Sequence, residues 1–125
     1  MKILTSDQIK KADIHTIEKL KITPIDLMEN AAIACSNWIR NKYLTSRKFI
    51  FLCGNGNNGG DGLAIARIIS KFGYSCSCFE YSIKKKSSED YLINKKKLKS
   101  KIKILTIEAL KTISFNKKHI IIDSI

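Results

Sequence analysis

Hydrophobic residues recur at helical spacing in the part of the chain that precedes Lys48. Thr5 and Gln8 have the spacing of a capping box, which predicts a first helix that begins there and fades over residues 21–23. Thr23 followed by a proline predicts the start of a second helix. Its apolar positions share one face, which we expect to be buried: Leu27, Met28, Ala31, Ala32, Cys35, Trp38 and Ile39. Glu29 and Asn30 fall among them, so at least one is expected to need a polar partner near the core.

From Lys48 the pattern changes to short apolar runs that alternate with helical stretches. Strands are predicted over 49–53, 74–81, 102–105 and 119–123, and helices over 62–72, 87–98 and 108–113. Gly73 would end the first of these helices and Ser88 would cap the second. Alternation of this kind predicts a doubly wound, Rossmann-like parallel α/β sheet in three αβα layers, with the two N-terminal helices added to it. We expect one domain over 1–125, truncated after its fourth strand and therefore incomplete at its C-terminus.

The segment from Gly54 to Gly62 reads Gly-Asn-Gly-Asn-Asn-Gly-Gly-Asp-Gly and lies between a predicted buried strand and a helix. Glycines let the backbone approach a phosphate closely, and the unpaired N–H groups at a helix start attract anions. Asn55, Asn57 and Asn58 offer amide donors and acceptors, while Asp61 could cap the helix or accept a sugar hydroxyl. We therefore expect this loop to hold a phosphate-bearing small molecule.

Gly54, Gly56 and Gly59 also satisfy the G-x-G-x-x-G spacing of dinucleotide-binding folds. Glu80 follows about twenty residues later, at the end of the next predicted strand, where such folds hold a ribose. The alternative is a tight turn without a ligand. The succession of glycines and asparagines exceeds what a turn requires, so we favour the ligand site.

Composition narrows the classes of partner. The net charge is +12, but the basic residues are mostly lysines in the runs 84–86 and 95–97, with few aromatic residues among them. We therefore predict a solvated Lys-rich surface and no nucleic-acid interface. The alternative is a weak attraction for anionic ligands, which would favour a phosphorylated substrate. The cysteines form no C-x-x-C pair, so we expect no zinc site, and we expect Cys76 and Cys78 to be reduced core residues on one side of a strand. No secretory signal or membrane span is predicted, which makes a cytoplasmic location the default.

The continuation of the loop through Asn57–Gly62 is more specific than a dinucleotide fingerprint. Together with Asp13, the segment Leu-Met-Glu-Asn-Ala-Ala at 27–32 and the Ile-rich strand ending in Asp123, it resembles the YjeF N-terminal domain family, the NAD(P)H-hydrate epimerases. The resemblance implies interconversion of the R and S epimers of hydrated NADH and NADPH, which serves cofactor repair. It implies that Asn57, Asn58, Gly59, Gly60 and Asp61 contact the substrate, that Asn58 and Asp123 bind K⁺, and that the chain forms a homodimer. The family's Phe-Gly-x-Gly loop, and a later Asp and Ser, do not occur before Ile125, so we expect an incomplete substrate site and ion shell.

The reaction needs proton transfer at the hydrated ring, and the residue that carries the proton is left unassigned. Asp61 is the better candidate of the two nearby carboxylates, because an Asp123 that binds K⁺ would be a poor proton carrier. His15 and His119 are expected to be structural or surface residues. A non-catalytic nucleotide-binding scaffold and an inactive truncated fragment stay open as alternatives. An ordinary NAD-dependent oxidoreductase would require a following catalytic domain and is less favoured.

Overall fold

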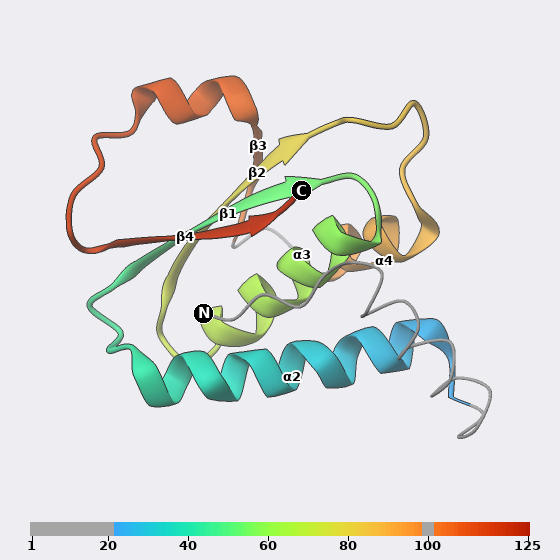
Figure 1. Cartoon of the computed structure of the whole chain (residues 1–125), viewed down its shortest axis with the longest axis horizontal. Helices are drawn as coiled ribbons and strands as arrows, with labels where there is room; N and C mark the ends of the chain where they lie inside the picture. The colour runs from blue at the N-terminus through green and yellow to red at the C-terminus, as the bar shows by residue number, and fades with distance from the viewer. Residues whose placement is uncertain (1–21, 99–101) are drawn as a thin grey trace.

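The computed structural model describes residues 22–98 and 102–125, and within them four parallel strands form one sheet (Figure 1). The strands are β1 (Lys48–Gly54), β2 (Ser75–Tyr81), β3 (Ile104–Thr106) and β4 (His119–Ser124), in the spatial order β3-β2-β1-β4. Lys48 of β1 is paired with Ser75 of β2 on one side and with His119 of β4 on the other. The predicted parallel sheet is confirmed, while the helix expected from Thr5 lies outside the described residues.

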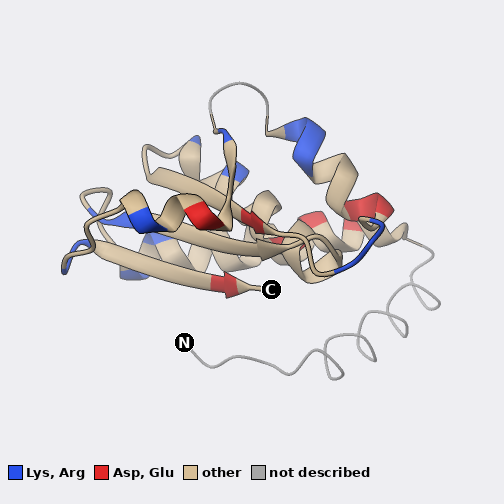
Figure 2. Cartoon of the chain, turned by 90° about the horizontal axis from the view of Figure 1, so that it is seen from above, with Lys and Arg blue, Asp and Glu red and all other residues tan. Residues whose placement is uncertain are grey.

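Helices cover the two faces of this sheet unequally. In the described ranges, α2 (Pro24–Lys42), α3 (Asn57–Ser70) and α4 (Glu89–Lys97) lie together on one face, and the short 3₁₀ helix η2 (Ile107–Thr112) lies on the other (Figures 1 and 2). The chain therefore runs from β1 to β3 across one face and returns to β4 across the other. This is the predicted doubly wound topology, and the winding reverses between β1 and β4.

Two helix starts follow the predicted capping. The Thr23 hydroxyl accepts a hydrogen bond from the Asp26 N–H at 3.2 Å, and the Ser88 hydroxyl accepts one from the Tyr91 N–H at the same distance. The first turn of α4 is acidic and its last turn is basic, which complements the helix dipole (Figure 2). None of the helices in the described part of the chain combines the length and apolar character needed to cross a membrane.

The core lies between the sheet and α3. Phe51 and Cys53 of β1 and Leu63 of α3 are fully buried there, and burial of each large apolar side chain contributes about 1.5–3 kcal/mol. The predicted face of α2 is only partly confirmed, since Ala31, Cys35 and Trp38 are exposed. The buried stripe of α2 is narrower because the helix packs chiefly on α3; it consists of Met28, Ala32, Ser36 and Ile39.

The polar partner expected for the second helix is Arg67. Its guanidinium Nη2 donates to the Glu29 carboxylate, which joins α3 to α2 through an ion pair that is largely shielded from solvent. The Arg67 side chain is 13% exposed and that of Glu29 is 29% exposed. This contact confirms that Glu29 lies near the core, and it joins the last turn of α3 to α2.

Candidate functional site

The turn between β1 and α3 is shorter than the sequence indicates. β1 ends at Gly54, only Asn55 and Gly56 follow, and α3 begins at Asn57. The prediction that the helix begins at Gly62 is therefore wrong by five residues, because the glycines that suggested a loop form the first turns of the helix. Gly56 is the N-cap in an extended conformation, and no side chain caps this helix end. Its first N–H groups point out of the carboxyl end of the sheet without a side-chain acceptor.

The glycines of α3 allow a close approach between backbones. A Cβ on Gly59 would overlap the carbonyl oxygen of Gly54, and one on Gly62 would overlap the Ser124 hydroxyl. A Cβ on Gly60 would lie 3.3 Å from the terminal methyl of Met28. Among the described glycines only Gly73 has a positive φ, so the reason for glycine in α3 is space and not backbone conformation. The helix start therefore rests directly on the ends of β1 and β4.

Asn58 and Asp123, the predicted ion ligands, meet at the end of β4. The Asn58 side-chain amide donates to the carbonyl oxygen of Ile125 at 3.0 Å, and the Ile125 N–H donates to Asp123 Oδ1 at 3.2 Å. Both side chains belong to exposed residues, and they come from separate elements. The structure thus brings them to one residue at the point where the sheet reverses its winding, and their role as ligands stays a prediction.

The other predicted contact residues differ in exposure. Asn57 is exposed in the first turn of α3, whereas Gly59 and Gly60 are buried. Asp61 is half-buried in the second turn, and Gly56 is the N-cap. Of the two alternatives for Asp61, capping of the helix is therefore wrong, and contact with a sugar hydroxyl stays a prediction. Partial burial of the Cys35 thiol, and then the negative charge of Asp61, raise the pKa of Cys35, which indicates that the Asp61 carboxylate lies toward α2.

Glu80 is engaged within the chain. Its Oε1 accepts a hydrogen bond from the Tyr91 hydroxyl at 2.6 Å and lies 3.5 Å from the Lys95 ammonium. Burial and this hydrogen bond raise the pKa of Tyr91, so the phenol stays protonated and keeps donating to Glu80. Both partners lie on α4, and the structure therefore gives no support to the prediction that Glu80 holds a ribose.

Asn55 has a role that the sequence analysis missed. Asn55 is buried, with only 3% of the residue exposed. Its side-chain amide forms hydrogen bonds with both the N–H and the carbonyl group of Lys84. Nδ2 donates to the Lys84 carbonyl at 2.8 Å, and Oδ1 accepts from the Lys84 N–H at 3.1 Å. The Asn55 carbonyl also accepts from the Ser88 N–H at 2.9 Å. The connection from β2 to α4 is thereby fixed against the glycine turn, a contact across 29 residues that no local pattern reveals.

The cysteines and the described histidine have structural surroundings. All four cysteines are free, and Cys78 is fully buried against the α3 side of the sheet, with Cys76 partly buried there. Cys53 is close enough for a thiol–thiol hydrogen bond, and this contact and burial raise the pKa of Cys78. His119 Nδ1 accepts from the Asn116 N–H at 3.1 Å, and its ring packs edge-on to Phe115. His15 lies outside the described residues.

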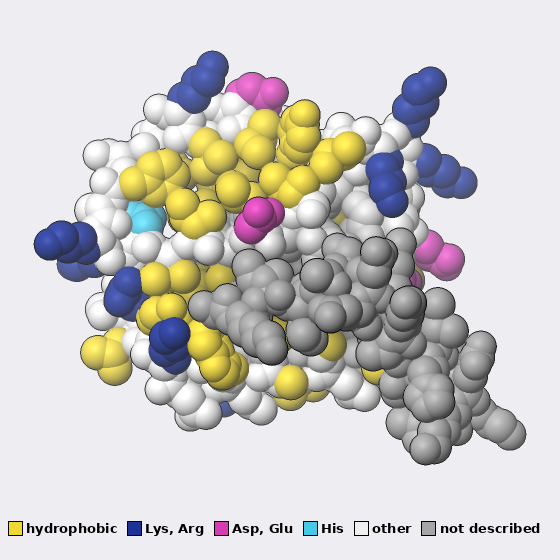
Figure 3. Space-filling view, viewed as in Figure 1, with side chains coloured by type: hydrophobic (Ala, Val, Ile, Leu, Met, Phe, Trp, Pro, Cys, Tyr) yellow, Lys and Arg dark blue, Asp and Glu magenta, His cyan; other side chains and the backbone are white. Residues whose placement is uncertain are grey.

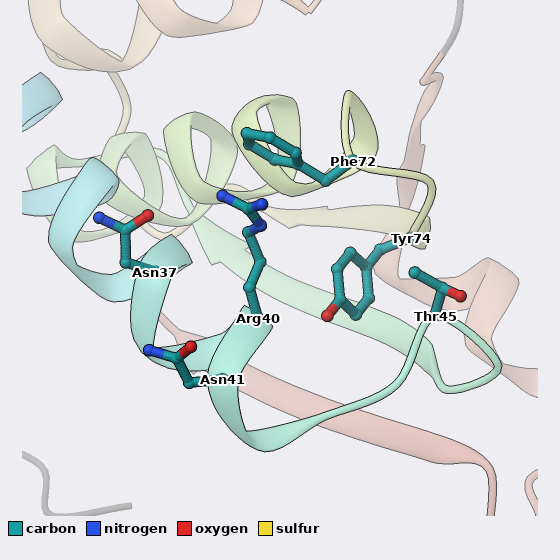
Figure 4. Close-up of a pocket in the computed structure, with 6 residues that line it drawn as sticks. All are labelled: Asn37, Arg40, Asn41, Thr45, Phe72 and Tyr74. Atoms are coloured by element: carbon teal, nitrogen blue, oxygen red, sulfur yellow. The ribbon is translucent and has the colours of Figure 1, made fainter.

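A hollow of about 560 Å³ lies at the opposite end of α3 (Figure 4). The Arg40 guanidinium stacks over the Phe72 ring at 3.5 Å from its centroid. Asn37 and Asn41 point away from this stack in Figure 4, and the Tyr74 hydroxyl donates to the Tyr43 carbonyl. The polar groups around the hollow therefore do not converge on one point.

A parallel sheet in the order 3-2-1-4, with a glycine-rich helix start at its point of reversal, is typical of α/β domains that bind phosphate-bearing ligands. Comparison with known proteins identifies one family within this class. The chain belongs to the YjeF-related protein N-terminus family, whose model matches residues 24–125.

Relatives with curated names agree with this assignment. The chain is 38% identical over 110 residues to the bifunctional NAD(P)H-hydrate repair enzyme Nnr of Dictyoglomus turgidum, covering 86% of this chain and 21% of that protein. It is 37% identical over 90 residues to an NAD(P)H-hydrate epimerase of Lentilactobacillus buchneri, covering 71% and 42% of the two chains. The solved structure of yeast ynu0 (YNL200c) matches with a TM-score of 0.64 and 27% identity, covering 85% of this chain and 47% of the yeast chain. The chain therefore spans less than half the length of these relatives.

Proposed function

We propose that this chain provides the nucleotide-binding end of an NAD(P)H-hydrate epimerase, which interconverts the R and S epimers of hydrated NADH and NADPH for cofactor repair. The Lentilactobacillus buchneri relative is named as an NAD(P)H-hydrate epimerase at 37% identity, and the Dictyoglomus turgidum relative as an NAD(P)H-hydrate repair enzyme at 38%. The observation that carries the proposal is the uncapped start of α3, which rests on the strand ends beside Asp123 at the reversal of the sheet. Ligands of doubly wound folds bind at this position.

In this proposal the substrate contacts come from the first two turns of α3. The N–H groups of Asn57, Asn58 and Gly59 face an anionic part of the substrate, because they lie at the positive end of the helix dipole. Gly59 keeps the helix close to β1, and Gly60 keeps it close to α2 and α4, so that these N–H groups are fixed before the substrate arrives. Asp61 follows on the same helix and completes the proposed set of contact residues.

The donor set at the end of β4 fits a potassium ion. Asn58 and Asp123 approach the same residue from two elements and offer amide and carboxylate oxygens, the ligands that hard cations prefer. Within residues 22–98 and 102–125 no group of three or more His, Cys, Asp or Glu lies together. We propose that Asn58 and Asp123 hold K⁺, which would supply positive charge beside a bound phosphate. As the family resemblance implies, we further propose a cytoplasmic protein that forms homodimers.

The test is an assay of epimer equilibration. Separated R and S epimers of hydrated NADPH are incubated with the chain in K⁺ or in Li⁺ buffer, and their ratio is followed by chromatography. We expect faster equilibration in K⁺, and at least a tenfold loss for Asp123→Asn. The matched control is Glu108→Gln, which removes an exposed carboxylate from η2 and should leave the rate unchanged.

The outcomes separate the candidate functions. No acceleration in either buffer would overturn the epimerase proposal for this chain. If hydrated NADPH still bound tightly in that case, the chain would be a nucleotide-binding scaffold. Equal losses for Asp123→Asn and Glu108→Gln would remove Asp123 from the ion site and leave the activity itself in place.

A further inference from the structure

A lysine ammonium lies over the start of α3. A Cβ built on Gly56, the residue that caps this helix, would lie 3.3 Å from Lys84 Nζ and 3.6 Å from Lys84 Cε. Lys84 belongs to the connection between β2 and α4, whose lysine run is visible as the blue segment before α4 in Figure 2. Two elements far apart in the sequence therefore bring a positive charge to the end of the glycine turn.

The backbone of Lys84 is fixed in this place by Asn55. As described above, the buried Asn55 amide bonds both the N–H and the carbonyl of Lys84, and it also lies 3.4 Å from the Ser87 hydroxyl. Asn55 itself precedes Gly56 and is joined to the start of the helix. The arrangement fixes the backbone of Lys84, and so the base of its side chain, relative to the N-terminus of α3. In the described structure, Lys85 and Lys86 make no such contact with Asn55.

This placement brings two positive charges together at the start of α3. The N-terminus of α3 carries partial positive charge and has no side-chain cap. Lys84 forms no ion pair with the described residues, so its ammonium adds a second positive charge beside the first. A bound anion would be attracted by both charges, and the repulsion between them would be removed. The pair thus favours a ligand with more than one negative charge.

We propose that Lys84 binds the diphosphate of the substrate together with the N–H groups of α3, and that Asn55 is the positioning residue for Lys84. The identity of the substrate as a nicotinamide dinucleotide rests on the proposed function. The phosphate chemistry does not, because it follows from the geometry of Lys84, Asn55 and Gly56. The ammonium donates charge-assisted hydrogen bonds to the phosphate oxygens.

The first experiment uses inorganic pyrophosphate as the probe, titrated into the chain and followed by amide chemical shifts of the Gly56–Gly60 segment. Lys84→Gln should weaken binding about five- to tenfold and lower its dependence on salt. Lys86→Gln is the matched control, because it removes the same charge from the same exposed loop, and it should change binding less than twofold. Equal effects of the two variants, or no binding of pyrophosphate at this segment, would overturn the proposal.

The second experiment tests the positioning role of Asn55. Asn55→Ala should weaken pyrophosphate binding when Lys84 is present and should cost no further affinity in the Lys84→Gln background. Additive losses in the double variant would mean that Asn55 acts through the fold alone, and that part of the proposal would then be wrong. Lys84→Gln replaces an exposed side chain and should leave thermal unfolding unchanged, so it remains informative even where Asn55→Ala destabilises the protein.

Failure of this proposal can be told apart from failure of the proposed function. Pyrophosphate binding that depends on Lys84, without any epimerisation, would contradict the epimerase activity and support the phosphate site. Epimerisation with a KM that Lys84→Gln leaves unchanged would support the epimerase activity and contradict the role of Lys84 in binding the diphosphate.

Discussion

The two faces of the sheet differ sharply in how they are covered. On the face that carries α2, α3 and α4, side chains such as Phe51 and Leu63 have no exposed surface. On the face that carries η2, hydrophobic side chains are exposed, among them Leu105 at 44%, Phe115 at 47% and Ile121 at 55% (Figure 3). Within the described residues, η2 covers β2 and β3, where Phe79 is buried, and leaves β4 open.

The residues of the candidate site come from both faces of the sheet. Ser124 of β4 points toward α3 and donates to the Leu52 carbonyl at 3.0 Å, while its neighbour Asp123 is exposed on the opposite face. The glycines that bring α3 to the strand ends belong to the covered face, and the proposed ion ligand belongs to the open one. Parallel sheets are usually covered on both faces, whereas here part of the face that carries η2 is open. We therefore expect substitutions on the two faces to have very different effects on the free energy of unfolding.

The largest effect is expected at Gly59 on the covered face. Gly59→Ala would place a methyl group against the Gly54 carbonyl, a backbone atom that cannot move without shifting β1 or α3. We expect the folded state to be lost or destabilised by at least about 4 kcal/mol, measured by urea denaturation. Gly56→Ala is the control, because its methyl group would meet only the flexible end of Lys84, and it should cost less than about 1 kcal/mol. Similar costs for both variants would contradict the close contact between α3 and β1.

The second-largest loss of stability is expected for a buried leucine, which can be compared with an exposed leucine on the other face. Leu63→Ala empties a fully buried position beneath α3 and should lower the free energy of unfolding by about 3 kcal/mol. Leu105→Ala removes the same atoms from an exposed position of β3 and should cost less than about 1 kcal/mol. Denaturant titrations of the two variants measure the difference directly. A cost at Leu105 that approaches the cost at Leu63 would show that the open face is covered in solution.

The elements that the sequence predicted well are those whose signal is local. The alternation of short apolar runs and helical segments predicted all four described strands within two residues, and the caps at Thr23 and Ser88 were read from single side chains. The start of α3 was mispredicted because glycine disfavours helices in general. Only the packed structure shows that Gly59 and Gly62 occur there because the strand ends leave no space for a side chain.

In the candidate site, too, some residues could be predicted from the sequence and others could not. Asn58 and Asp123 were predicted through a family resemblance, and the structure brings them to one end of the sheet, at Ile125. The fixing of Lys84 by Asn55 was not predictable, because it joins residues 29 positions apart and has no spacing signature. Glu80 shows the opposite error: its spacing suggested a ribose, but Tyr91 and Lys95, whose contacts are tertiary, bind its carboxylate.

The smallest effect on stability is expected at Ile121, the most exposed hydrophobic side chain of β4. Ile121→Thr keeps a β-branched residue in the strand and should change the free energy of unfolding by less than about 0.5 kcal/mol. It should nevertheless reduce self-association, because it removes apolar surface from the open face; light scattering over a concentration series measures this. Ile122→Thr is the matched control on the same strand: that side chain packs toward the core, so the change should destabilise the fold by more than 1 kcal/mol, on the order of a lost core contact. If Ile121→Thr were as destabilising as Ile122→Thr, the contrast between the faces would fail at the strand that carries Asp123.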